Sequence, residues 1–211
     1  MKVLHVLDLW VPLFSGYSFR SQSIIRFQQA LGLEPVVLTS PKHGSLNDEV
    51  EARDGIPYYR TGRSRDGLAT RLAVASELDL MLCLARRMAH VVESEKIDLI
   101  HSHSPLLNGL PALWVGRRRK IPVVYEARAF WEDAAVDHGT TREGSLRYRS
   151  TRSLETFLFR SADRVVTICE AMRAELAGRG IAAEKVAVVP NGVDAGWFTP
   201  QPMAVGLTRE L

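Results

Sequence analysis

The most regular feature of the chain is a series of short apolar runs separated by longer amphipathic segments. The runs are rich in Val, Ile and Leu and almost free of polar residues, which is typical of strands covered on both faces of a parallel sheet. We expect strands at residues 3–7, 36–38, 97–100, 121–125, 165–168 and 186–189. Residues 56–59 form a weaker candidate, because Pro57 favours the edge of a sheet.

Helical patterns lie between these runs. We expect helices at residues 18–31, 68–92, 105–116, 145–160 and 170–177. In the first of them Ile24, Phe27, Gln28 and Leu31 recur at helical spacing, and Gly32 follows as a stop signal. The alternation of strands and helices predicts an α/β fold with a doubly wound, mainly parallel sheet and helices on both faces, a Rossmann-like arrangement.

Composition fits a single soluble α/β domain. The 211 residues are 46% hydrophobic and 24% charged, which is ordinary for a globular protein, and a net charge of +3 gives no reason to expect a nucleic-acid partner. Cys83 and Cys169 are isolated, so we expect neither a disulfide framework nor a zinc site, and a cytoplasmic location. The first apolar run is too short for a signal peptide or a membrane span.

Ligands of an open parallel sheet bind beyond the carboxyl ends of its strands. After the first strand, Ser15 and Gly16 precede a helix, and small residues at a helix N-terminus favour a phosphate. The competing interpretation is a plain turn with Ser18 as the helix N-cap. Neither G-x-G-x-x-G nor G-x-x-x-x-G-K-[ST] occurs, which counts against a dinucleotide dehydrogenase and a P-loop enzyme.

Two histidines follow the run at residues 97–100. His101 and His103 point the same way if the strand continues through them, and we expect His103 to contact substrate. The alternative is a histidine satisfied by backbone hydrogen bonds. A His-x-His pair can also bind metal, but no third ligand is visible nearby, so no metal is predicted. His5, inside the first strand, is assigned to the core.

A long loop follows the run at residues 121–125. It mixes aromatic residues, carboxylates and arginines, among them Glu126, Arg128 and Trp131. Carboxylates accept from sugar hydroxyls, and arginine forks hold phosphate or carboxylate. The alternative is a solvated loop with surface ion pairs, although long loops in compact domains are more often functional.

The end of the predicted domain carries a more specific pattern. Residues 190–194 read P-N-G-V-D directly after a strand, residues 198–200 read F-T-P, and residues 162–166 read A-D-R-V-V. These motifs resemble the hinge and preceding strand of glycosyltransferase family 4. The opening Ser15–Gly16 loop and the strand ending in H-S-H fall in the expected order, so the resemblance covers essentially the whole chain.

The resemblance implies a GT-B fold, in which the active site lies between two Rossmann-like domains. It assigns residues 1–198 to the N-terminal, acceptor-binding domain, and residues 199–211 to a linker toward a C-terminal domain of the same protein that binds the nucleotide-sugar. It implies retaining transfer from a nucleotide-sugar donor to a glycan or lipid-linked acceptor, with no cofactor and no obligatory metal. The isolated chain is expected to be inactive, because it would bind only half of the reactants.

The resemblance also supplies candidate residues. His103 matches the second histidine of the family's H-x-H strand end, but Glu126 stands where many members carry a histidine after the next strand. We therefore expect Glu126 and His103 to be catalytic by orienting sugar or acceptor hydroxyls. The candidate substrate-binding residues are Ser15, Gly16, Tyr17, Arg128, Trp131 and Asn191, with Arg128 holding an acceptor phosphate. The Y-E-x-R-x-F-W-E-D pattern resembles a subgroup associated with exopolysaccharide and exosortase clusters.

Two further interpretations stay open. The basic residues 117–120 follow an apolar helix that includes Trp114, which favours peripheral contact with an anionic membrane. The same residues also suit a solvated helix end, where cations complement the helix dipole. A non-catalytic sugar- or nucleotide-binding module of flavodoxin-like type is the alternative to a transferase, although such a module needs no P-N-G-V-D hinge.

Overall fold

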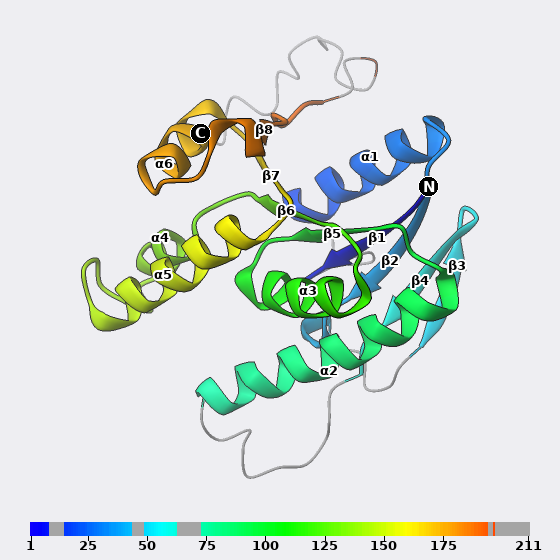
Figure 1. Cartoon of the computed structure of the whole chain (residues 1–211), viewed down its shortest axis with the longest axis horizontal. Helices are drawn as coiled ribbons and strands as arrows, with labels where there is room; N and C mark the ends of the chain where they lie inside the picture. Colours follow the sequence, from blue (N-terminus) through cyan, green and yellow to red (C-terminus); the bar gives the residue numbers. More distant parts are fainter. Residues whose placement is uncertain (9–14, 44–48, 63–72, 194–195, 197–211) are drawn as a thin grey trace, which may run out of the picture.

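A computed structural model describes residues 1–8, 15–43, 49–62, 73–193 and 196. The described residues form an eight-stranded sheet in the order β3-β4-β2-β1-β5-β6-β7-β8 (Figure 1). The strands are β1 Lys2–Leu7, β2 Glu34–Thr39, β3 Val50–Arg53, β4 Ile56–Arg60, β5 Leu99–His103, β6 Val123–Ala127, β7 Arg164–Thr167 and β8 Val186–Val188. Every neighbouring pair is parallel except β3 and β4. The predicted doubly wound α/β fold is confirmed.

Helices cover both faces of this sheet. They are α1 Gly16–Ala30, α2 Ala73–Glu95, α3 Leu106–Arg119, α4 Trp131–Asp137, α5 Leu146–Ser161 and α6 Glu170–Gly178, with short 3-10 turns at Pro41–His43 and Ala183–Lys185. Helix α1 lies on the face opposite α2 and α3 (Figure 1). The predicted division at residue 198 and the linker at 199–211 lie outside the described residues.

The predicted apolar face of the first helix is wrong. Phe27 and Leu31 are 72% and 80% exposed, whereas α1 buries Ser18, Ser21 and Ile25. The helix is therefore rotated so that a largely polar face meets the sheet. The long loop after β6 also differs from its prediction, because residues 131–137 form helix α4.

The strand order places a topological switch point between β1 and β5. The chain runs from β1 to β2 and β4 on one side, and then crosses to β5, β6, β7 and β8 on the other. Ligands of doubly wound sheets bind at the carboxyl ends of the strands at such a point. Side chains alternate along β1, so Leu4 and Val6 join the main apolar core while His5 turns to the α1 face.

Candidate functional site

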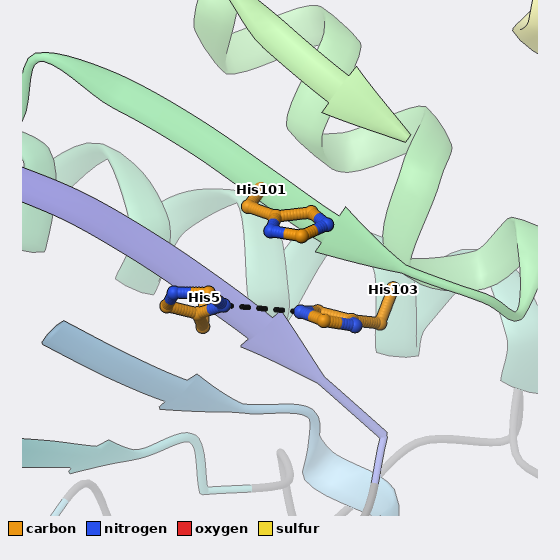
Figure 2. A group of neighbouring side chains, drawn as sticks. All are labelled: His5, His101 and His103. Carbon is orange, nitrogen blue, oxygen red and sulfur yellow. Dashed lines mark hydrogen bonds between the residues drawn. The ribbon is translucent and has the colours of Figure 1, made fainter. Parts of the chain in front are cut away.

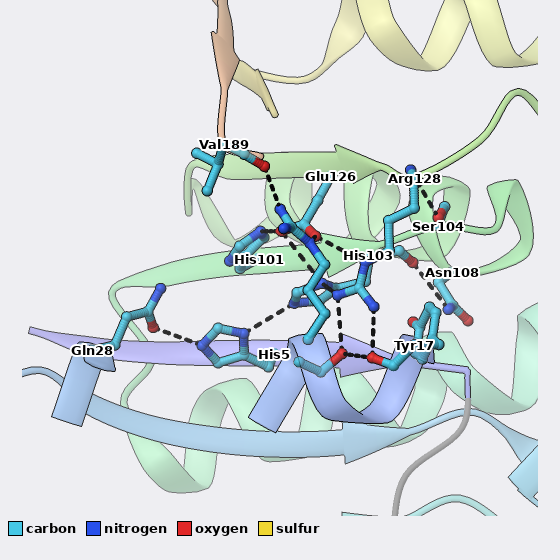
Figure 3. Close-up of polar contacts among 12 residues, drawn as sticks. His5, Tyr17, Gln28, His101, His103, Ser104, Asn108, Glu126, Arg128 and Val189 are labelled. Atoms are coloured by element: carbon cyan, nitrogen blue, oxygen red, sulfur yellow. Dashed lines mark hydrogen bonds and ion pairs between the residues drawn. The ribbon is translucent and has the colours of Figure 1, made fainter. Parts of the chain in front are cut away.

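A buried carboxylate lies at the carboxyl end of β6, beside the switch point. Glu126 is 1% exposed and pairs in register with His103 of β5. Its Oε1 accepts hydrogen bonds from Arg20 Nε at 2.9 Å and from Arg128 Nε at 2.8 Å (Figure 3). One carboxylate oxygen is therefore held between two guanidinium groups, one from α1 and one from the segment after β6.

These contacts keep Glu126 ionised. Burial alone would raise the pKa of its carboxyl, but the contacts with His103 and His101 lower it, and the net pKa lies far below the usual value. Burial also lowers the pKa of His103 to about 3, so His103 is uncharged at neutral pH. Arg20 and Arg128 are the two cations that donate hydrogen bonds directly to the Glu126 carboxylate.

Three side chains extend this cluster into a chain of hydrogen bonds under α1. Arg128 Nη2 lies 2.7 Å from His103 Nδ1, His103 Nε2 lies 3.1 Å from His5 Nδ1, and His5 Nε2 lies 2.8 Å from Gln28 Oε1 (Figure 3). A guanidinium only donates and an amide oxygen only accepts. Each histidine is therefore neutral and protonated on Nε2, which agrees with the lowered pKa of His5, caused mainly by burial.

The third histidine lies beside this chain. The ring of His101 stacks on His103 with centroids 4.3 Å apart, and its Nε2 lies 3.3 Å from Glu126 Oε2. Among the described residues, His5, His101 and His103 form a group whose ligand atoms lie within 4.8 Å of one another (Figure 2). His5 is thus the third histidine that the sequence did not place beside the pair. Hydrogen bonds occupy the facing nitrogens of His5 and His103, and the rings of His101 and His103 stack rather than converge, so the arrangement favours a hydrogen-bonded chain over a metal centre.

Arg128 is engaged mainly by the protein itself. Besides Glu126 and His103, it donates to the carbonyl oxygen of Tyr17 at 2.7 Å and to Ser21 Oγ at 2.9 Å, and its guanidinium lies 4.2 Å from the centre of the Tyr17 ring. Tyr17 in turn accepts a hydrogen bond from the Asp8 amide at 3.1 Å. Arg128 therefore locks α1 onto the strand edge, and its predicted role as a phosphate ligand stays a prediction.

Ser15 and Gly16 begin α1 next to this cluster. Ser15 is the N-cap, in a reciprocal capping box with Ser18, so the expectation of Ser18 as N-cap is wrong by three residues. Gly16 is exposed, and a Cβ built on it would meet nothing within 4 Å. Among the residues that the structure describes, none therefore packs against the Cα of Gly16 at the start of α1.

The other two predicted residues lie at different places. Asn191 Oδ1 accepts from Arg20 Nη1 at 3.1 Å, which joins it to the Glu126 cluster. Trp131 opens α4, where its amide donates to Glu155 Oε2 at 3.0 Å and its ring lies 5.6 Å from Lys42 Nζ. Its described contacts thus belong to a second polar centre.

That second centre holds two buried carboxyl groups. Glu132 and Glu155 are both 0% exposed, and Arg179 Nη2 lies 2.7 Å from Glu132 Oε1. Tyr125 also approaches Glu155, with its hydroxyl 3.5 Å from Oε1. Burial and the neighbouring Glu132 raise the pKa of Glu155 well above its usual range. The centre joins α4, α5 and the residue after α6.

Arg20 and Gln28 are the site residues that the sequence interpretation missed. Both come from the side of α1 that contacts the residues of the sheet, together with Tyr17 and Ser21. Residues 17, 20, 21 and 28 recur at helical spacing, so a polar stripe was present in the sequence. A polar stripe on a helix normally faces solvent. It could be assigned to the buried face only once the structure had shown that the apolar stripe of the same helix is exposed.

The doubly wound sheet, with a cluster of charged side chains at its switch point, defines a Rossmann-like α/β domain. Residues 15–192 match the family model of the glycosyl transferase 4-like domain, and the chain belongs to that family.

Known proteins agree with this placement. Sulfoquinovosyl transferase SQD2 of Arabidopsis thaliana is 25% identical over 195 residues, covering 89% of this chain and 34% of the relative. Sucrose-phosphate synthase from Thermosynechococcus elongatus has a TM-score of 0.67 at 15% identity, over 95% of this chain and 51% of that one. Anabaena HepE, solved in complex with UDP-glucose, has a TM-score of 0.59 at 17% identity, over 100% and 49%. The chain thus spans about a third to a half of the relatives' lengths.

Proposed function

We propose that this chain is the acceptor-side domain of a retaining glycosyltransferase, which moves a sugar from a nucleotide-sugar to a glycan or lipid-linked acceptor. The carrying observation is the Glu126 cluster, in which two guanidinium groups share one carboxylate at the switch point of a glycosyl transferase 4-like domain. Membership of the family and the likeness to HepE, named as a complex with UDP-glucose, support a nucleotide-sugar donor.

The charge of the cluster suits a departing diphosphate. Arg20 and Arg128 are about a tenth exposed, and Glu126 is their anionic partner. The two guanidinium groups bring two positive charges to the one negative charge of Glu126. An excess cation held in place before the reaction stabilises negative charge that develops on a leaving group. The open backbone at Gly16 gives such a group a second point of approach.

In the proposed reaction the acceptor oxygen attacks on the face from which the diphosphate leaves. The bond from the anomeric carbon to the diphosphate oxygen breaks and its electron pair stays with the diphosphate. A bond to the acceptor oxygen forms, and the acceptor's hydroxyl proton passes to the departing diphosphate. Glu126 and His103 orient hydroxyl groups of the sugar or the acceptor, and no metal or cofactor takes part.

The test uses the protein that carries this chain together with a nucleotide-sugar-binding domain. Radiolabelled UDP-, GDP- and ADP-sugars are offered with free glycans and with polyprenyl-diphosphate-linked saccharides. Glu126→Gln should lower transfer by about 100-fold or more, because a neutral amide no longer orders the two guanidinium groups. The matched control is Glu143→Gln, an exposed residue outside the cluster. Transfer by Glu126→Gln equal to that of the control would overturn the role of Glu126.

The same assay separates the transferase from a binding module. Residues 1–211 alone should give no transfer, since the donor and the acceptor are not brought together. If the whole protein binds a nucleotide-sugar but never transfers it, the flavodoxin-like binding module is favoured instead. Acceptors that carry a lipid diphosphate would support the proposed role in cytoplasmic-face synthesis of exopolysaccharide, including the exosortase-associated subgroup.

A second observation favours peripheral contact with an anionic membrane. At the end of α3 and on α5, Trp114 and Phe157 are each about half exposed, and the guanidinium groups of Arg118 and Arg117 lie 4.6 Å and 5.9 Å from their ring centres. Aromatic rings beside cations suit the headgroup region of a bilayer. Among the described residues no helix is both long enough and apolar enough to span a membrane, so this contact would be peripheral.

Sedimentation with vesicles tests the membrane contact. The chain should sediment with phosphatidylglycerol vesicles at low salt and much less with phosphatidylcholine vesicles. Arg117→Glu with Arg118→Glu should abolish sedimentation, while Arg173→Glu, at an exposed position on α6, should leave it unchanged. Equal sedimentation of the two variants would remove the proposal.

A further inference from the structure

Arg20 connects three separate parts of the chain. From α1 its Nη2 donates to the carbonyl oxygen of Val189 at 2.8 Å, and its Nη1 donates to the carbonyl oxygen of Pro190 at 3.0 Å and to Asn191 Oδ1 at 3.1 Å. Its Nε donates to Glu126 Oε1 at 2.9 Å (Figure 3). One side chain thus binds residues 189–191, which directly follow β8, and the carboxylate at the end of β6.

The two groups that Arg20 joins differ in how firmly the rest of the protein holds them. Glu126 is 1% exposed and fixed within the sheet, whereas Asn191 is exposed. The amide of Val189 donates a hydrogen bond to the carbonyl oxygen of Thr167 in the sheet at 2.8 Å. Pro190 has no amide hydrogen, so its backbone can be held only through its carbonyl group. Arg20 supplies that contact.

The geometry uses the whole guanidinium group. Nε, Nη1 and Nη2 each donate to a different residue, which a planar fork with fixed donors can do and a single ammonium group cannot. Arg20 and Arg128 moreover donate to the same oxygen of Glu126, so a change at one donor alters the hydrogen bond of the other.

We infer that Arg20 is a positioning residue that couples the placement of residues 189–191 to the hydrogen bonding of Glu126. When these residues shift, Arg20 shifts with them, and of the two hydrogen bonds to Glu126 Oε1 only that from Arg128 then remains. The assignment of Glu126 to a substrate-facing site rests on the proposed function, but the coupling itself does not. In a protein that continues beyond this chain, movement of the continuing part relative to the sheet would reach Glu126 by this route.

The test uses this chain without substrate, so its outcome is independent of any transferase activity. Arg20→Gln removes the charge and the fork, Arg20→Lys keeps only the charge, and Asn191→Ala removes a contact that reaches Glu126 only through Arg20. Arg26→Gln, an exposed position on the same helix, is the matched control. Two quantities are measured: hydrogen exchange of the Val189 amide, and the NMR resonance of the Arg128 Nε–H.

Arg20→Gln and Arg20→Lys should each raise exchange at Val189 by roughly tenfold or more, since hydrogen bonds from a charged group are lost. All three variants should shift the Arg128 Nε–H resonance, Asn191→Ala least, and Arg26→Gln should change neither quantity. The Asn191→Ala shift is decisive, because a merely structural role of Arg20 would not carry a change at residue 191 to Arg128. An Arg128 resonance that Asn191→Ala leaves unmoved, or unchanged Val189 exchange in Arg20→Lys, would overturn the coupling. Arg20→Lys and Asn191→Ala keep the test decisive if Arg20→Gln fails to fold.

Discussion

Neighbouring residues of β6 lead to two buried carboxylate centres of opposite electrostatic character. Glu126 points to the α1 face, where Arg20 and Arg128 donate to it, and its contacts with His103 and His101 bring its pKa far below the usual value. Tyr125 points to the other face and approaches Glu155, whose pKa is raised beside Glu132. Burial acts in the same direction on both carboxyl groups. The neighbours differ, because the hydrogen bond and charge of Glu132 raise the pKa of Glu155, whereas the side-chain contacts of Glu126 lower its pKa.

The difference separates a candidate site from a structural network. The Glu126 cluster has an excess of cations and lies at the switch point, where an anionic ligand would complete it. The second centre holds Glu132 and Glu155, with Arg179 2.7 Å and Arg152 3.8 Å from Glu132, and it joins α4, α5 and the residue after α6. Two buried polar clusters of similar composition thus have different expected roles, and substitutions can test each assignment.

The largest effect is expected at Arg179, which lies 2.7 Å from the buried Glu132 and is 3% exposed. Arg179→Met leaves the buried Glu132 with only the more distant Arg152, 3.8 Å away, which should lower the free energy of unfolding by about 3–5 kcal/mol. Urea unfolding at neutral pH measures the loss. Arg173→Met on the preceding helix is the control, because its ion pair with Glu170 is exposed and should contribute less than about 1 kcal/mol. Similar losses in the two variants would mean that the second centre does not hold α4 and α5 together.

The next effect is expected at Glu126. Glu126→Gln keeps an acceptor oxygen but removes the charge that two guanidinium groups share, so the free energy of unfolding should fall by about 2–3 kcal/mol at neutral pH. Urea unfolding beside the exposed Glu143→Gln gives the comparison. A stable Glu126→Gln would show that the two arginines are satisfied without the carboxylate, and the electrostatic contrast between the centres would then be wrong.

Two glycines probe the packing around the two centres. A Cβ on Gly109 of α3 would lie 2.9 Å from the Tyr125 ring and would also collide with Leu158, whereas one on Gly16 would meet nothing within 4 Å. Gly109→Ala should therefore cost about 1–3 kcal/mol of stability, and Gly16→Ala should change it by less than about 0.5 kcal/mol. Thermal unfolding measures both. A destabilised Gly16→Ala would contradict the open backbone at the start of α1.

The sequence predicted the sheet well because each central strand is an apolar run bounded by turns. It missed β3, whose four residues are mostly exposed and carry no apolar run. It also assigned His103 and Glu126 to the ends of two strands, and these strands are neighbours in the sheet, so that the two residues lie side by side. Strand ends are fixed by the order of the elements, so sequence reasoning reaches them.

The rotation of a helix about its own axis is harder to predict. Phe27 and Leu31 suggested one buried face for α1, but Ser18, Ser21 and Ile25 are buried. A polar face is buried there because His5, His103 and Arg128 offer it partners. Arg20 could be assigned only once that rotation was known. The hydrogen bonds of residues 189–191 to α1 likewise depend on contacts between segments about 170 residues apart.

The smallest effect is expected from Glu155→Gln at acid pH. Burial and Glu132 raise the pKa of Glu155, so below pH 4.5 an amide replaces a carboxyl group that is neutral in both the folded and the unfolded state, and stability should change by less than about 1 kcal/mol. At higher pH the folded state retains a proton that the unfolded state releases. The stability of the wild type therefore falls by about 1.4 kcal/mol per pH unit between the unfolded value near 4.5 and the raised folded value, and the amide variant escapes this loss.

Glu126 behaves in the opposite way. The ionised Glu126 stabilises the folded state above pH 4.5. This stabilisation is lost as pH falls, because the unfolded state then binds a proton that the folded state does not bind. Relative to the wild type, Glu155→Gln should therefore gain stability toward alkaline pH, and Glu126→Gln should gain it toward acid pH. Urea unfolding from pH 3 to pH 9 measures both curves, with Glu143→Gln as the flat reference. Parallel curves for the two variants would show that the centres share one electrostatic character, and the distinction between site and structural network would then fail.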